Sequence, residues 1–280
     1  MKLYYFFLSF IGLTLFAHAQ ISDKEKNALV DFYQSTDGDH WRNSWDMSLD
    51  PSEWNGVTIE NNTVTEVKLS FNSINGELPS SIANLKNLKV LDLSFNSLHS
   101  NIPVSITKLM HLESLKLFSN KFSGKLPRNL GNLKSLTHLE LYNNDLEGTI
   151  PESIGKLKKL ENINISSNQL TGKMPNSLFD ISSLKKIALF DNNLFGKIPN
   201  SVGQLSNLEE LVLSNNSFYG GLPKSLLKLD KLNILLLGQN NFTGNFANLP
   251  DYMPNIRDLD IDEENARGIL VILDEELSDN

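Results

Sequence analysis

The sequence predicts an α/β solenoid, in which short strands and connecting turns are wound into a stack of similar coils. Asparagine recurs every 24 residues without an insertion, and prolines (Pro79 to Pro223) and glycines (Gly76 to Gly244) keep the same step. Ser100 is the one substitution in the glycine series. Self-similarity at such a fixed period indicates a repeat architecture, and stacked coils bury apolar faces that single coils cannot. The repeated asparagines are Asn72, Asn96, Asn120, Asn144, Asn168, Asn192, Asn216 and Asn240.

Each part of the repeat has a physical explanation. The alternation in Leu115-Lys116-Leu117 predicts a short strand with one buried face. An asparagine side chain carries donors and an acceptor, so a buried asparagine column can satisfy backbone groups where each coil turns. Glycine permits a tight bend after the strand, and proline fixes φ on the return path. We expect residues such as Ile154, Leu157 and Leu160 to pack the convex side.

The first residues have the pattern of a secretory signal peptide, predicted at 1–19. Lys2 supplies the positive charge, residues 3–16 are largely apolar, and Ala17-His18-Ala19 offers a cleavage site between small residues. The alternative is an N-terminal membrane anchor, but the apolar stretch is shorter than the about 20 residues that a spanning helix needs. We therefore expect a secreted product, extracellular or in the cell envelope, without a membrane span after cleavage.

Residues 20–62 are predicted to form an N-terminal cap, because an open solenoid exposes its core at each end. Ser22-Asp23-Lys24-Glu25 has the spacing of a capping box that opens a helix. After the Asp37-Gly38 turn come the three tryptophans of the chain, which we expect to cover the first coil. One face of the helix would carry Ala28, Leu29, Phe32 and Tyr33, and the tryptophans are Trp41, Trp45 and Trp54.

The repeat resembles a known family. The segment from Leu141 to Pro151, Leu-Tyr-Asn-Asn-Asp-Leu-Glu-Gly-Thr-Ile-Pro, is similar to the plant-type leucine-rich repeat of receptor-kinase ectodomains and polygalacturonase-inhibiting proteins. The resemblance covers roughly residues 60 to 250, and it implies a right-handed leucine-rich-repeat superhelix with a concave parallel sheet. The cap resembles that family's N-terminal cap, but Ser52 and Ile59 stand where the family has a cysteine pair. The resemblance therefore implies a cap held by packing alone.

We expect eight 24-residue repeats over residues 63–250 and a degenerate ninth repeat with an acidic C-terminal cap over 251–280. Ile256, Leu259 and Ile261 continue the apolar phase, whereas Glu264 and Val271 stand where the next asparagine and proline belong. Asp258, Asp260 and Asp262 would face outward on the last strand. They indicate either a calcium site or a charged edge that discourages pairing with another chain, and their spacing of about 7 Å favours the edge.

Composition and motifs argue against catalysis. The chain has no cysteine, a formal net charge of -8, and neither a phosphate-binding glycine loop nor a zinc signature. His138 and Glu140 could transfer a proton, but no nucleophile accompanies them, and a solvated charge pair is the better interpretation. We expect no enzyme activity, no cofactor, no metal and no nucleic-acid partner. Glycosylation, relevant only in a eukaryotic host, would fall at Asn61, Asn164, Asn215 and Asn241.

The concave face is the predicted binding surface. Three residues per coil should point to it, and aromatic residues recur in one of these columns with charged neighbours. Exposed aromatic side chains are typical of the centres of binding interfaces. We expect a protein, peptide or glycan partner; the alternative is a structural, envelope-associated or adhesion protein without a soluble ligand. The candidate residues are Phe118, Tyr142, Phe190, Lys116, His138, Glu140 and Lys186.

Overall fold

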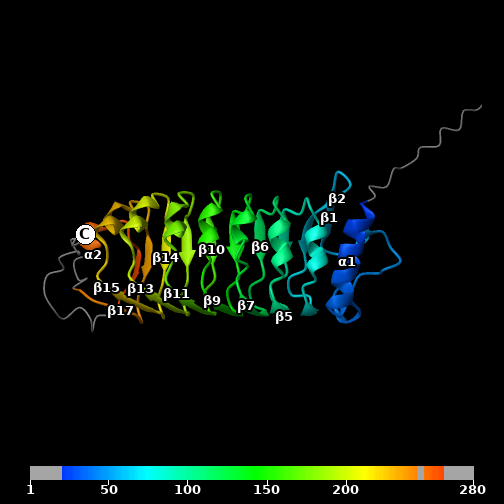
Figure 1. Ribbon diagram of the computed structural model, residues 1–280, viewed down its shortest axis with the longest axis horizontal. Helices are drawn as coiled ribbons and strands as arrows, with labels where there is room; N and C mark the ends of the chain where they lie inside the picture. Colours follow the sequence, from blue (N-terminus) through cyan, green and yellow to red (C-terminus); the bar gives the residue numbers. More distant parts are fainter. Residues whose placement is uncertain (1–20, 245–248, 262–280) are drawn as a thin grey trace, which may run out of the picture.

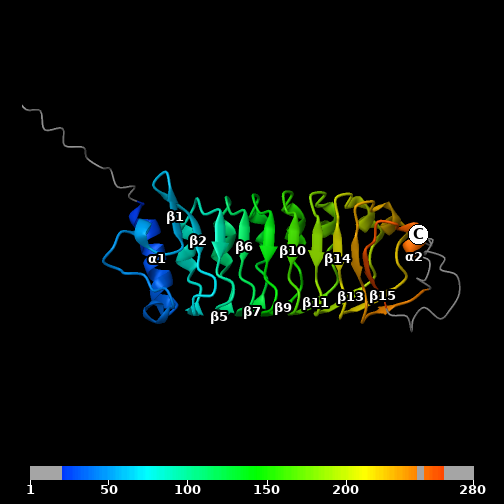
Figure 2. The ribbon, with the colours of Figure 1, turned by 180° about the vertical axis from the view of Figure 1, so that it is seen from behind.

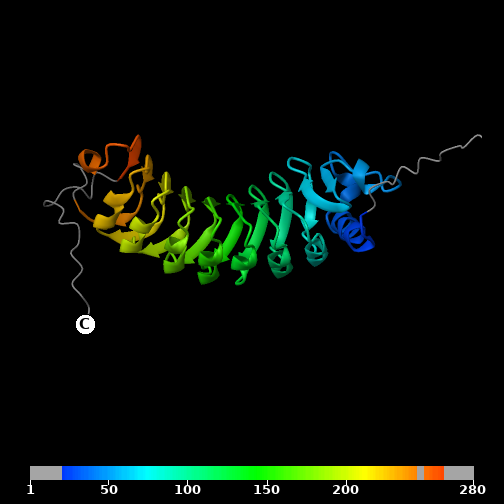
Figure 3. The same ribbon diagram turned by 90° about the horizontal axis from the view of Figure 1, so that it is seen from above.

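The computed structural model describes residues 21–244 and 249–261, and these form an elongated stack of coils (Figures 1 and 2). The predicted signal peptide lies outside the described residues, as do Asp262, Glu264 and Val271. Seen from above, the stack is an arc with short 3-10 helices on its outer side (Figure 3). The predicted solenoid is confirmed.

A ten-stranded sheet follows the inner, concave side of the arc. Its first pair is antiparallel, and every later pair is parallel with a register of 24 residues, as in Leu115 beside Leu139. The strands, in order across the sheet, are β1 (Val57–Glu60), β2 (Thr63–Lys68), β4 (Val90–Asp92), β6 (Ser114–Lys116), β8 (His138–Glu140), β10 (Asn162–Asn164), β12 (Lys186–Ala188), β14 (Glu210–Val212), β16 (Ile234–Leu236) and β18 (Asp258–Asp260).

A second parallel sheet, which the sequence analysis did not predict, runs along the stack beside the first. Each of its strands follows a repeat asparagine and ends at or near the repeated glycine, as β9 ends at Gly148. The strands are β3 (Asn75–Glu77), β5 (Ser97–Asn101), β7 (Lys121–Lys125), β9 (Asp145–Gly148), β11 (Gln169–Gly172), β13 (Asn193–Gly196), β15 (Ser217–Gly220) and β17 (Asn241–Phe242).

Short 3-10 helices begin after the repeated prolines and line the outer side of the arc. Pro151 directly precedes η6, where its fixed φ suits the extended residue before a helix. Ile154, Leu157 and Leu160 are fully buried beneath this side, as predicted. The helices are η3 (Ser80–Asn84), η4 (Val104–Lys108), η5 (Leu130–Asn132), η6 (Glu152–Lys156), η7 (Asn176–Asp180), η8 (Asn200–Gln204) and η9 (Lys224–Lys228).

The asparagine column binds neighbouring coils together. Asn168 donates from its side-chain nitrogen to the carbonyls of Leu141, Ile165 and Ser166 at 3.0–3.1 Å. Its side-chain oxygen accepts from the backbone nitrogen of Leu146 at 3.0 Å. The predicted role of this column is confirmed, because each such side chain satisfies backbone groups that the turn would leave unpaired. The same pattern repeats at Asn96, Asn120, Asn144, Asn192, Asn216 and Asn240.

The bend directly after each concave strand is made by the residue before the asparagine, not by the repeated glycine. Asn143, for example, has φ 55°, in the left-handed region, while Gly148 has φ 76° at the end of the second-sheet strand. Glycine suits such angles because it has no β-carbon. Ser100, which replaces glycine in one coil, holds φ 65° and donates its hydroxyl proton to Glu77 at 2.8 Å.

The N-terminal cap packs as predicted. Helix α1 (Asp23–Ser35) opens with a capping box in which the Ser22 side chain accepts from the Glu25 backbone nitrogen. The Glu25 carboxylate also accepts from the Val64 backbone nitrogen at 3.1 Å, which ties the helix to β2. Trp45 and Trp54 stack with ring centroids 4.8 Å apart. The segments η1 (Gly38–His40) and η2 (Pro51–Glu53) directly precede the buried Trp41 and Trp54. Because the chain has no cysteine, this packing holds the cap without a disulfide.

At the other end, β18 pairs in parallel with β16 and continues the concave sheet beyond the eighth coil. The short helix α2 (Leu249–Tyr252) precedes it, and Leu249 and Met253 are buried. Leu259 and Ile261 are half-buried against the core, as the continued apolar phase predicts. Asp258 and Asp260 are exposed on this last described strand.

Candidate ligand-binding surface

Four aromatic rings stack side by side along the first four coils, at the carboxyl ends of the concave strands. Centroid distances are 4.0 Å for Phe71 and Phe95, 5.0 Å for Phe95 and Phe118, and 4.3 Å for Phe118 and Tyr142. The outer two pairs are nearly parallel, and the middle pair is edge-on. We call Phe71, Phe95, Phe118 and Tyr142 the ring ladder.

The ring ladder is an exposed apolar strip. Phe71 keeps 54% and Phe95 keeps 41% of its surface exposed, and Phe118 and Tyr142 are half-buried. Contiguous exposed aromatic surface is uncommon on soluble proteins and marks interaction sites.

Phe71 and Phe95 are held in an unfavourable backbone conformation. Their φ angles are 56° and 53°, in the left-handed region, where bulky side chains are rare. In the later described coils the same position holds a polar residue: Ser119, Asn143, Ser167, Asp191, Asn215 or Gln239. Strained residues of this kind gather at functional sites, where the surrounding structure enforces them.

Sequence reasoning missed Phe71 and Phe95 and placed Phe190 in one column with Phe118 and Tyr142, with a gap at Ser166. The structure brings Phe118 and Tyr142 together but leaves Phe190 outside the ring ladder. Ser166 occupies the intervening coil and is 9% exposed, so it offers no ring to bridge the gap. The Phe190 side chain lies apart from the ring ladder and is 39% exposed.

The charged candidates are engaged with neighbours across the sheet. Lys116 lies 3.8 Å from the Glu140 carboxylate, and Lys186 forms an ion pair with Glu210, which sequence reasoning had not included. The His138 imidazole shares a 2.8 Å hydrogen bond with the Thr137 hydroxyl rather than with Glu140. These pairs nearly neutralise the candidate surface, so the ring ladder is its most distinctive feature.

Two ionisable groups on this face have shifted pKa values. Burial against the ladder raises the pKa of the Tyr142 phenol, and the charges of Glu140 and Asp92 raise it further. The hydrogen bond from Lys68, 2.7 Å away, lowers the pKa of the Glu66 carboxyl. Tyr142 is therefore neutral throughout the physiological range and contributes a ring and a hydroxyl, not a charge.

Not every concave position reaches solvent. Ser94, Ala188 and Ser214 are 2%, 4% and 6% exposed, so several positions expected to point outward are covered by their neighbours. Of the glycosylation candidates, Asn61 and Asn241 are exposed, whereas Asn215 donates to the Asp191 carboxylate and Asn164 accepts from the Ser166 backbone nitrogen.

One depression on the described surface, of about 410 Å³, is lined by residues that include Lys125, Arg128, Glu152 and Ser153. The Ser153 hydroxyl donates to the Arg128 carbonyl and not to a base. Within the described ranges, no group of three or more histidines and carboxylates is placed to hold a metal ion.

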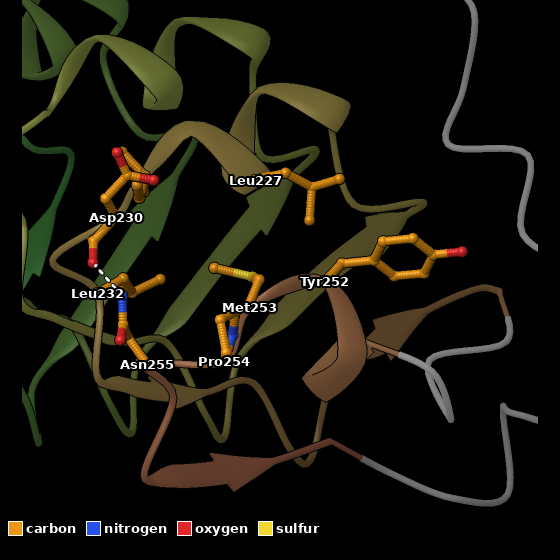
Figure 4. A pocket seen from close by; sticks show the side chains of 8 residues that line it. Leu227, Asp230, Leu232, Tyr252, Met253, Pro254 and Asn255 are labelled. Carbon is orange, nitrogen blue, oxygen red and sulfur yellow. Dashed lines mark hydrogen bonds between the residues drawn. The ribbon is translucent and has the colours of Figure 1, made fainter.

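A smaller pocket of about 80 Å³ lies where the last coils meet helix α2 (Figure 4). Met253 and Leu227 approach it from opposite sides, and Tyr252 lies at its rim. The Asn255 side chain donates to the Asp230 carbonyl at 2.8 Å, which fixes the turn into β18. Ligand pockets are commonly several times larger, so we assign this one to the packing of the C-terminal end.

Comparisons with known proteins agree with the stack of repeated coils described above. A family model described as a leucine-rich repeat region matches residues 67–193, and a leucine-rich repeat model matches residues 207–229. The chain is a leucine-rich-repeat protein. A search of curated proteins finds no match for this leucine-rich-repeat chain. Across the described ranges, no helix is both long enough and apolar enough to cross a membrane.

Solved structures of similar fold include plant receptor ectodomains. The Arabidopsis receptor kinase HAESA, in complex with an extended IDA peptide hormone, is 29% identical with a TM-score of 0.78, and the match covers 85% of this chain and 41% of that one. The PEPR1–AtPEP1 structure is 32% identical with a TM-score of 0.75, covering 80% and 32%. This leucine-rich-repeat chain thus spans about a third to two fifths of these ectodomains. A plant ice-binding protein is 25% identical with a TM-score of 0.75, covering 87% and 80%.

Proposed function

We propose that this protein is a secreted recognition module that binds a protein, peptide or glycan through its concave face, with the ring ladder at the centre of the interface. The single observation that carries the proposal is the contiguous ladder itself, two of whose rings are held in left-handed backbone conformations. Aromatic anchors supply much of the binding energy of interfaces. The resemblance to ectodomains crystallised with peptide hormones supports the same class of function.

The experiment selects ligands with the wild-type protein and then compares their binding to two double variants. The wild-type protein is panned against a random peptide library and applied to a glycan array. Each hit is then measured against Phe71→Asn with Phe95→Asn, which removes two ladder rings. The matched control is Phe195→Ser with Tyr219→Ser, which removes two rings on the second sheet with similar exposures of 41% and 44%.

The expected result is that hits lose at least about tenfold in affinity for the ladder variant and keep their affinity for the control. Phe118→Ala with Tyr142→Ala should act in the same direction. Equal losses in both double variants, or hits indifferent to the ladder, would show that the concave rings only stabilise the stack. Whether the hits are peptides or glycans decides the class of ligand.

One observation favours a second candidate, ice binding. The chain covers 80% of the plant ice-binding protein, a share about twice that of the receptor ectodomains. Thermal hysteresis and ice-recrystallisation assays on the wild-type protein test this directly. Ice-binding activity that survives loss of the ring ladder would favour ice binding over ligand recognition. The absence of such activity in the wild-type protein would exclude ice binding. An envelope-associated scaffold stays the alternative if neither assay finds a ligand.

A further inference from the structure

The charge of the chain is divided unequally between its parts. Residues 61–244, which make up the coils, carry 19 lysines and arginines against 14 aspartates and glutamates. The coils are therefore basic, although the whole chain has a formal net charge of -8. The acidic residues are concentrated in the N-terminal cap and after residue 250.

The basic residues form a strip along the turns that lead from the outer 3-10 helices back to the concave strands. Four consecutive turns, each at or directly after the end of a 3-10 helix, occupy residues 84–87, 108–111, 132–135 and 156–159. These turns contain six lysines and a histidine and no acidic residue, and all six lysines are exposed. We call these lysines the lysine strip: Lys86, Lys108, Lys134, Lys156, Lys158 and Lys159.

The strip is ordered from coil to coil. The Lys134 ammonium donates to the Lys156 carbonyl at 3.4 Å, and the Lys158 ammonium donates to the Asp180 carbonyl at 2.9 Å. Each acceptor is the last residue of the next coil's 3-10 helix. Unpaired carbonyls at a helix end attract cations, so the repeat itself places these ammonium groups in a row.

The acidic groups beside the strip do not neutralise it. Glu161 lies in the segment after the fourth turn, and Lys185, from the following coil, binds its carboxylate at 2.8 Å and lowers its pKa. Glu113 lies in the equivalent segment after the second turn and is exposed. Glu152 and Asp180 are the acidic residues of the neighbouring 3-10 helices. These four acidic residues compare with six lysines in the four turns of the lysine strip.

From this strip we propose a second binding surface, on the turns between the outer 3-10 helices and the concave strands, for a linear acidic polysaccharide. A flexible polymer with one carboxylate per sugar can follow this row of turns along the curved stack, where a flat bilayer would touch only a short part (Figure 3). The strip is built from lysines, which act as point charges and do not require the fixed geometry of an arginine fork. Single-stranded nucleic acid is disfavoured, because the four turns contain no phenylalanine, tyrosine or tryptophan on which bases could stack.

The test uses the full chain and polygalacturonate, with fully methyl-esterified polygalacturonate as the matched uncharged ligand. The strip variant is Lys134→Gln, Lys158→Gln, Lys159→Gln. The control, Lys121→Gln, Lys125→Gln, Lys173→Gln, removes the same charge from exposed positions on or beside the second sheet. Affinity is measured by titration calorimetry at low and physiological salt, and unfolding curves check that both variants are folded.

We expect wild type and control to bind polygalacturonate with affinity that falls as salt rises, and the strip variant to bind at least about tenfold more weakly. The esterified polymer should not bind. Equal binding of the esterified polymer, equal losses in both variants, or preference for vesicles containing anionic lipid would overturn the proposal. The proposal would also be overturned if wild type did not bind polygalacturonate but self-associated at low salt, and if the strip variant abolished this self-association. The concave ring ladder is intact in both variants, so this result is independent of the proposed function.

Discussion

The Phe71 and Phe95 rings stack 4.0 Å apart and 13° from parallel, although both residues hold left-handed φ angles. Stacking of one aromatic pair contributes about 0.5–1.5 kcal/mol beyond the area it buries. A left-handed conformation costs roughly 1–2 kcal/mol for a residue other than glycine, asparagine or aspartate. Stacking of this pair by itself therefore does not offset the strain of two phenylalanines, which favours a role in binding over one in stability.

Replacing both phenylalanines by asparagine should separate stability from binding. Asparagine tolerates the left-handed region and already occupies this position at Asn143 and Asn215. The double variant loses two ring contacts, Phe71 with Phe95 and Phe95 with Phe118, and relieves the strain of two residues. These two effects should nearly balance, so we expect a free energy of unfolding within about 1 kcal/mol of wild type. Urea unfolding followed by fluorescence measures this. A loss of several kcal/mol would mean that the ladder is structural.

The period of 24 residues was enough to predict the coils, the buried leucines and the asparagine column, because each of these depends on spacing alone. Phe71 and Phe95 were missed for a physical reason. They follow the strand, where alternation no longer tells which face a side chain takes, and only the left-handed backbone brings their rings into line with Phe118. The second sheet was missed similarly, since its strands are short and lack a clear alternation.

The lysine strip was readable from the sequence but hidden by the total charge. Lys86, Lys134 and Lys158 keep the repeat's phase, each one or two coils from the next. The net charge of -8, summed over the whole chain, was used only to argue against a nucleic-acid partner. Sorting charges by repeat position, rather than summing them, would have shown the strip.

Replacing Asn168 by alanine should strongly destabilise the stack. The change leaves the Leu141, Ile165 and Ser166 carbonyls and the Leu146 backbone nitrogen without their partner. An unsatisfied buried polar group costs about 1–3 kcal/mol, so we expect a loss of about 3 kcal/mol or more. Denaturant unfolding gives the value, with exposed Gln169→Ala as the neighbouring control, expected within about 0.5 kcal/mol. Similar effects of the two substitutions would contradict the assigned role.

Trp45 should be the most sensitive position of the disulfide-free cap. It is 3% exposed, stacks on Trp54, and donates its indole proton to the Asn55 carbonyl at 2.8 Å. Trp45→Ala should cost about 3–5 kcal/mol and uncover the first coil. Thermal unfolding and hydrogen exchange of β2 report the loss. Trp45→Phe, which keeps a ring, should lose less, and a cap that tolerates alanine would show that packing at Trp45 is not what holds it.

The pKa of the Tyr142 phenol should report whether its ring is packed in the ring ladder. Burial and nearby carboxylates raise its pKa above the ordinary 10.0, so the folded state favours the neutral phenol. A group whose pKa is raised on folding stabilises the protein fully below its unfolded pKa, and this contribution is lost as the pH rises through the folded pKa. The phenol absorbance that disappears in Tyr142→Phe should therefore titrate above pH 10. The stability advantage of wild type over that variant should decline over the same range, whereas a midpoint at or below 10 would mean that Tyr142 is solvated and not packed against Phe118.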